Sequence, residues 1–196
     1  MSRYPRTAAV PSLSRSIVTG AIGFCLVSLC VFATVAFGER WLYRNLGVLG
    51  SYLVWTVLFV VLSGALFGSL VRGHWRLPRF YLLWTIAFFA YAATWTIAYF
   101  MLRRTTGEII GALLGSILMA VVLAAGFRAL GSLVKLSAVL FVANALGYFI
   151  GAAIFTSLLN ETGMLLFGVV YGLFFGAGIG AALHFAQLTA VSEPAT

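Results

Sequence analysis

Among the 196 residues of this chain, 63% are hydrophobic and only 8% are charged, whereas soluble proteins carry about 25% charged residues. This composition excludes an ordinary soluble enzyme or binding domain, and the length leaves no room for such a domain beside the apolar segments. The net charge of +8 would indicate nucleic acid in a soluble protein. Here the arginines flank apolar segments, so we expect the lipid bilayer as partner and no nucleic acid.

Six apolar stretches without Asp, Glu, Lys or Arg predict the fold. Each can supply the roughly 20 apolar residues that a helix needs to cross a bilayer core about 30 Å thick. We predict an all-α, polytopic membrane protein whose six transmembrane helices form one compact bundle, residues 16–190, between cytoplasmic tails at 1–15 and 191–196. The helices are expected at about 16–38, 46–71, 79–102, 107–128, 134–159 and 163–188.

The first predicted helix contains both cysteines, Cys25 and Cys30. Two cysteines five residues apart on one helix point in different directions and cannot form a disulfide. Arginines precede this helix as in a signal peptide, but the uncharged run 16–38 is longer than the usual 7–15-residue apolar region. We therefore predict a transmembrane helix that is not cleaved.

The second and third predicted helices are rich in aromatic residues. All five tryptophans precede residue 105, and the pattern of residues 84–89 returns at 95–100, eleven residues later. Eleven residues make about three helical turns, so equivalent positions share one face. Trp84 lies near a helix end and is interpreted as part of an interfacial aromatic belt.

Deeper aromatic side chains in these two helices allow two interpretations. They could line a cavity for a lipid, quinone, pigment or flat apolar solute, or they could pack the core, which is the interpretation we favour. These residues are Trp55, Phe88, Phe89, Tyr91 and Trp95.

Glycines recur every four residues in the last three predicted helices. Residues four apart share one helix face, so each row allows another backbone to approach closely. We expect the rows to pack these three helices against one another. The rows are Gly107, Gly111 and Gly115; Gly147 and Gly151; and Gly168, Gly172, Gly176 and Gly180.

Two alternatives exist for the glycine rows. One row could face another copy of the chain or a membrane-protein partner, and the row from Gly168 to Gly180 is the best candidate because it is the longest. The segment 176–180 could instead break its helix and expose backbone to a substrate.

Three polar residues within or near the spans are candidates for binding a solute or acting as a gate. Asn144 lies midway along the fifth helix, where it could bind a solute or hydrogen-bond a neighbouring helix. His184 could be a proton-sensitive gate or an interfacial imidazole, and a metal pair with His74 is a weaker alternative. Thr156 is either a solute contact or a small packing residue.

The residue types that the sequence lacks argue against catalysis. It contains no Asp, and its four glutamates lie at span ends or in loops and tails. We find no paired carboxylates, no Ser/His/Asp set, no nucleotide loop and no Cys/His cluster. We therefore expect no enzyme, no proton coupling, and neither a cofactor nor a metal site.

The positive charges set the expected orientation. With the N-terminus inside, the cytoplasmic segments hold eight of the twelve Lys and Arg residues and the outer loops hold four. The positive-inside rule then places both termini in the cytoplasm. We expect the protein in a bacterial inner (plasma) membrane.

Two functions fit this layout. The first is a small permease-like or solute-binding membrane component without its own energy source, similar only in size and layout to the substrate-binding subunits of vitamin importers. The second is a non-catalytic, lipid-binding assembly or stabilising subunit of a larger membrane complex. A polar path through the bundle past Asn144 would favour the first function, and a sealed apolar core the second.

Overall fold

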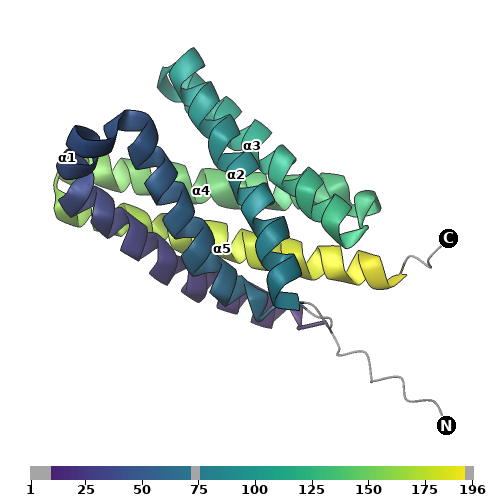
Figure 1. The fold of residues 1–196 in the computed structure, drawn as a ribbon. Helices are drawn as coiled ribbons and strands as arrows, with labels where there is room; N and C mark the ends of the chain where they lie inside the picture. The colour runs from purple at the N-terminus through teal and green to yellow at the C-terminus, as the bar shows by residue number, and fades with distance from the viewer. Residues whose placement is uncertain (1–9, 72–75, 193–196) are drawn as a thin grey trace, which may run out of the picture.

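The computed structural model describes residues 10–71 and 76–192, and all regular structure in them is helical. This confirms the all-α prediction. The predicted turn around His74 and the ends of both tails lie outside the described residues. The elements are α1 (Leu13–Gly68), α2 (Arg76–Leu102), α3 (Arg104–Phe127), the short 3-10 turn η1 (Leu130–Ser132), α4 (Leu133–Leu158) and α5 (Glu161–Ser192). Within these ranges, five helices are long and apolar enough to cross a membrane (Figure 1).

Helix α1 reverses direction at Gly47. Its 56 residues would extend about 84 Å if straight, but the ring of Phe24 stacks on that of Phe59 with centroids 5.4 Å apart. Gly47 has φ 67° and ψ −178°, a conformation that suits glycine because it lacks a Cβ. Residues 13–46 are called the first arm and residues 48–68 the second arm (Figure 1).

The sequence analysis expected a loop at residues 39–45, where the structure has helix. No glycine or proline interrupts this segment, and the Asn45 amide donates to the carbonyl of Trp41 at 2.7 Å. The charges at Glu39 and Arg40 therefore mark a polar stretch of helix. The helical break comes at the next glycine along the chain.

The glycine rows of α3 and α4 bring helices together, but only partly as expected. A Cβ added at Gly111 would lie 3.1 Å from the carbonyl oxygen of Trp95, so the α3 row packs against α2. A Cβ at Gly147 would lie 3.1 Å from the Cα of Tyr171, so the α4 row packs against α5. The predicted mutual packing of the last three helices is wrong for α3, whose glycines face α2.

The longest glycine row, on α5, faces the first arm of α1. A Cβ at Gly172 would lie 2.5 Å from the Cα of Cys25, and one at Gly176 would collide with the carbonyl of Gly20. This row is covered within the chain, which leaves these glycines no open face for another subunit. Helix α5 is also continuous through residues 176–180, so the alternative of a helix break there is wrong.

The two ends of the bundle differ. At the closed end, where α1 begins and α5 finishes, α2 lies against the second arm, and Trp84 donates its indole N–H to the Ser63 hydroxyl at 2.7 Å. Trp84 is 0% exposed, so its assignment to an interfacial belt is wrong. At the open end, where α1 reverses at Gly47, α2 and α3 diverge from the other helices (Figure 1).

Candidate functional site

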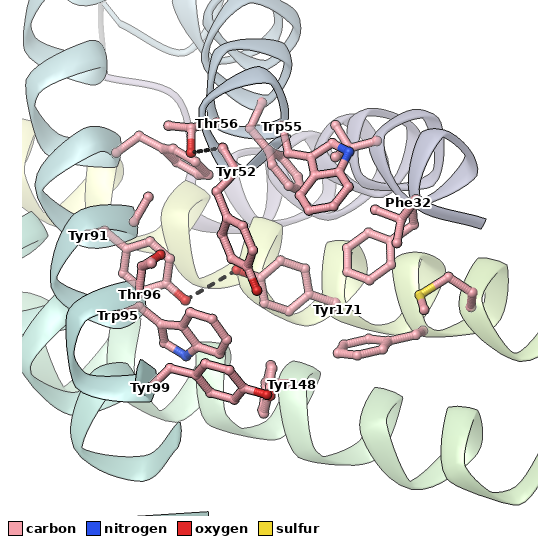
Figure 2. A pocket seen from close by; sticks show the side chains of 17 residues that line it. Phe32, Tyr52, Trp55, Thr56, Tyr91, Trp95, Thr96, Tyr99, Tyr148 and Tyr171 are labelled. Carbon is pink, nitrogen blue, oxygen red and sulfur yellow. Dashed lines mark hydrogen bonds between the residues drawn. The ribbon is translucent and has the colours of Figure 1, made fainter. Parts of the chain in front are cut away.

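A cavity of about 380 Å³ lies in the open half of the bundle and is called the inner cavity. This volume is within the range of about 300–1,000 Å³ that is usual for small-molecule sites. Both arms of α1 and helices α2, α4 and α5 contribute to its wall (Figure 2). The lining residues are Val31, Phe32, Val35, Tyr52, Trp55, Thr56, Phe59, Phe88, Tyr91, Ala92, Trp95, Thr96, Tyr99, Tyr148, Met164, Phe167 and Tyr171.

Aromatic rings fix one another in the cavity wall. Trp95 stacks on Tyr99 at 5.1 Å between centroids and meets Tyr148 edge-on at 5.6 Å. On the opposite side, Tyr52 and Trp55 make an edge contact at 5.4 Å. Each such pair contributes about 0.5–1.5 kcal/mol beyond the area that it buries, so the wall is held in shape by its own contacts.

Buried hydroxyls connect three helices on one side of the cavity. The Tyr91 hydroxyl donates to the side-chain oxygen of Asn144 at 2.8 Å, and it lies 3.3 Å from the Tyr171 hydroxyl (Figure 2). Asn144 is fully buried, and within the described part of the chain its amide nitrogen has no hydrogen-bond partner. This cluster joins α2, α4 and α5 through polar contacts in an otherwise apolar interior.

The floor of the cavity is a layer of phenyl rings centred on Phe24. Phe24 is 0% exposed, and its ring lies 5.4 Å from that of Phe59 and 6.4 Å from those of Phe88 and Tyr171. Below it, Phe175 makes an edge contact at 5.8 Å. In this conformation these rings separate the inner cavity from the closed end.

A second cavity of about 430 Å³ adjoins the first at the open end and is called the outer cavity. Val35 and Met164 line both cavities, so the two spaces are neighbours. The outer cavity is more polar, because it includes charged and amide side chains from α1 and from the junction of α4 with α5. These polar residues are Glu39, Arg40, Asn160 and Glu161.

Another carboxylate lies near the inner cavity without lining it. The side chain of Glu108, in the first turns of α3, interacts with the hydroxyl of Tyr148. Within residues 10–71 and 76–192, no three His, Cys, Asp or Glu side chains are grouped so that they could hold a metal ion. Carboxylates therefore surround the open end of the aromatic cavity without forming a cluster of metal ligands.

The structure brings several predicted aromatic residues together at the inner cavity. Trp55, Trp95, Tyr91 and Phe88 all line it, from the second arm and α2. Phe89 points outward and is 52% exposed. The interpretation that we favoured, core packing, describes Phe88 and the floor well, but it does not account for the open volume beside the tryptophans.

The polar candidates lie in three different places. Asn144 reaches the cavity only through Tyr91. Thr156 is exposed and donates to the carbonyl of Ala153 at 3.0 Å. His184 lies at the closed end, where its Nδ1 is 2.8 Å from the carbonyl oxygen of Pro11. Of these three, only Asn144 is connected to the cavity, and the described residues do not include His74.

Sequence reasoning missed most of the tyrosines in the wall. Five of the eight tyrosines line the inner cavity, although Tyr91 alone was singled out. A signal was present, since Tyr148 follows Gly147 and Tyr171 precedes Gly172 in the glycine rows. A tyrosine next to a glycine of such a row lies close to a helix–helix contact. Which residues of other helices its hydroxyl meets depends on the tertiary fold.

No protein-family model, curated protein or solved structure matches this chain. The cavity and its residues are therefore the evidence from which a function can be inferred.

Proposed function

We propose that this chain is a multi-pass integral membrane protein that binds a small, flat, mainly apolar solute in the inner cavity. It would serve as a permease-like or solute-binding component without its own energy source. The observation that carries the proposal is the aromatic wall around a volume of about 380 Å³. Aromatic and aliphatic linings with a few polar groups are typical of sites that bury small ligands.

The lining supports binding in preference to catalysis. Apart from the phenols of its tyrosines, the inner cavity is lined by apolar side chains, tryptophan rings and the hydroxyls of Thr56 and Thr96. A hydroxyl nucleophile needs a general base to activate it, and among the described residues no Asp, Glu, His, Lys or Cys side chain lines the inner cavity. We therefore propose that the solute leaves the site chemically unchanged.

The glycine rows favour solute binding over the assembly-subunit alternative. A stabilising subunit was expected to expose one glycine ridge for its partner. The row from Gly168 to Gly180 is instead covered by the first arm. The polar path past Asn144 that would favour permeation does not appear in the described part of the chain, because Asn144 is fully buried and reaches the cavity through Tyr91. The cavity therefore supports solute binding, and permeation would require the rings packed around Phe24 to move.

Placement in the membrane follows from the same elements. We propose six spans, with the two arms of α1 crossing separately, because Gly47 turns the second arm back along the first. With eight Lys and Arg residues on one side and four on the other, both termini would be cytoplasmic, in a bacterial inner membrane. Alkaline phosphatase inserted after Asn160 should be active, whereas a fusion to the C-terminus should be inactive; the reverse would contradict this orientation.

The binding proposal can be tested by filling the cavity. Ala92 lines it, so Ala92→Phe places a phenyl ring in the volume that the solute would occupy. Ile97, on the same helix, is 58% exposed, so Ile97→Phe adds aromatic surface on the outside. Equilibrium dialysis of 1-naphthylmethanol against the full chain in nanodiscs should show saturable binding that Ala92→Phe abolishes and Ile97→Phe preserves. Equal binding by the two variants would overturn the proposal.

A further inference from the structure

The two neighbouring cavities offer unlike environments to one ligand. The inner cavity is walled mainly by aromatic rings, whereas the outer cavity adds four charged or amide side chains to an otherwise apolar lining. Val35 and Met164 stand between them. Methionine is unbranched and has a flexible side chain, so Met164 can adjust to a ligand that reaches from one cavity into the other.

The charges of the outer cavity favour a cation. Glu39 and Glu161 contribute two carboxylates, whereas Arg40 contributes one guanidinium. Arg40 and Glu161 are exposed and Glu39 is partly buried, so solvent screens Arg40 more than it screens Glu39. The net charge of this lining is negative, and the less screened carboxylate is the one on the first arm.

The inner wall is formed mainly by aromatic rings. The indole nitrogen of Trp55 is buried and, among the described residues, has no hydrogen-bond partner. The Tyr91 hydroxyl already donates to Asn144. Aromatic faces carry negative potential and attract organic cations within about 6 Å of a ring centroid.

We infer that the site takes an amphiphilic organic cation, with its flat apolar body in the inner cavity and its ammonium group near Glu39 and Glu161. This inference rests on the proposed function and names the class of solute. The two carboxylates neutralise the ammonium group at the wetter end, while the rings bury the apolar body. An anion of the same shape would meet the carboxylates and the electron-rich ring faces, both unfavourable.

The test compares three naphthalene probes that share the body and differ in charge. The probes are a naphthylmethyl trimethylammonium salt, neutral 1-naphthylmethanol and anionic 1-naphthylacetate. Their dissociation constants are measured by calorimetry with the full chain in nanodiscs of zwitterionic lipid. We expect the cation to bind about tenfold more tightly than the alcohol, and the anion more weakly than either.

Variants then assign the preference to the outer cavity. Glu39→Gln and Glu161→Gln should together remove the tenfold preference for the cation and leave binding of the alcohol unchanged. Glu108→Gln is the matched control, because Glu108 lies near Tyr148 but lines neither cavity. It should keep most of the preference.

The outcomes separate this inference from the proposed function. If the alcohol binds but the cation binds no more tightly, the charge inference is overturned and the aromatic site stands. The same holds if the cation preference survives the double Gln variant. If neither probe binds in a way that Ala92→Phe abolishes, the proposed function itself fails.

A lipid could carry the same ammonium group on a flexible chain. Dodecyltrimethylammonium therefore serves as a fourth probe, with the same head group and no flat body. The aromatic walls predict that it binds at least tenfold more weakly than the naphthyl cation. Equal or tighter binding would overturn the assignment to a flat solute and point to a lipid amphiphile.

Discussion

The two ends of this bundle contain the same kinds of residues, but one end is tightly packed and the other contains a cavity. At the closed end, the helices are held by specific polar contacts between side chains and backbone: Arg79 donates to the carbonyl of Gly126 at 2.9 Å and Gln187 to that of Leu70 at 3.1 Å. At the open end, aromatic rings make both stacked and edge contacts, such as those of Trp95 with Tyr99 and Tyr148, and line a cavity of about 380 Å³. The difference lies in the course of α2, which converges with the second arm at one end and diverges from it at the other (Figure 1).

This contrast shows that aromatic content alone does not decide between a core and a site. Trp84 and Trp95 occupy equivalent positions in the sequence pattern of α2 that recurs after eleven residues. Trp84 is sealed against Ser63, whereas Trp95 forms a wall of the inner cavity. Trp84 packs in the core because α2 lies close to the second arm at that depth. Trp95 lines the cavity because the two helices have diverged there (Figure 1).

The largest expected effect comes from disrupting a close backbone contact between α5 and the first arm of α1. Gly176→Leu would drive a side chain into the backbone of Gly20. Overpacking costs about 1–3 kcal/mol where side chains can adjust, and more where the obstacle is backbone. We expect loss of most folded protein, measured by size-exclusion chromatography and thermal unfolding in detergent. Gly38→Leu is the control, because nothing lies within 4 Å of the Cβ it adds.

Opening the floor should have the next largest effect. Phe24→Ala removes a fully buried ring that five others surround. Truncations of this kind cost about 3–5 kcal/mol, so the midpoint of thermal unfolding should fall sharply. Phe37→Ala, at a position 72% exposed on the same arm, should change it little. Similar losses for both variants would contradict a packed floor.

Adding the same phenyl ring at two alanines of α2 compares the halves directly. Ala87 is 0% exposed in the core, and Ala92 lines the inner cavity. Ala87→Phe should destabilise by about 1–3 kcal/mol through overpacking. Ala92→Phe should leave thermal stability almost unchanged, because its ring has space. A larger loss for Ala92→Phe would show that the cavity is not open.

The smallest effect is expected from one hydroxyl beside the cavity. Tyr91→Phe removes the donor to Asn144 and leaves a buried amide oxygen unpaired. Interhelical hydrogen bonds in membranes contribute about 0.6–2 kcal/mol, so we expect a destabilisation of about 1 kcal/mol. A double-mutant cycle with Asn144→Leu should show that the two effects are not additive. Additive losses would mean that this hydrogen bond contributes nothing measurable.

Charge placement and hydropathy were enough to predict where the apolar helical segments lie, because both depend on local composition, but not that the first two segments form one helical element, α1. The pairing of helices was not predictable from the same signals. The row on α3 could have faced α4 or α5 as well as α2, since a glycine groove accepts any close backbone. The reversal of α1 was misplaced because Glu39 and Arg40 suggested a loop, whereas the helix persists until Gly47.

The candidate site was predictable only in part, for a related reason. Trp55 and Trp95 could be placed at a similar depth by counting residues along antiparallel helices. Phe32, Tyr148 and Tyr171 come from helices whose positions follow from tertiary packing. Sequence periodicity shows which residues share one face of a helix. It does not show where the faces of several helices stay apart and leave a cavity between them.

The pairing of α1 with α5 has a consequence for how the protein is made. The first arm finds its glycine-lined partner only in the last helix of the described chain, about 150 residues later, at the contact of Gly20 with Gly176. During translation, the earlier helices are made before this partner exists. The wall that needs both Phe32 and Tyr171 therefore forms last, and a chain that ends before α5 would leave the first arm without the partner of its closest backbone contacts.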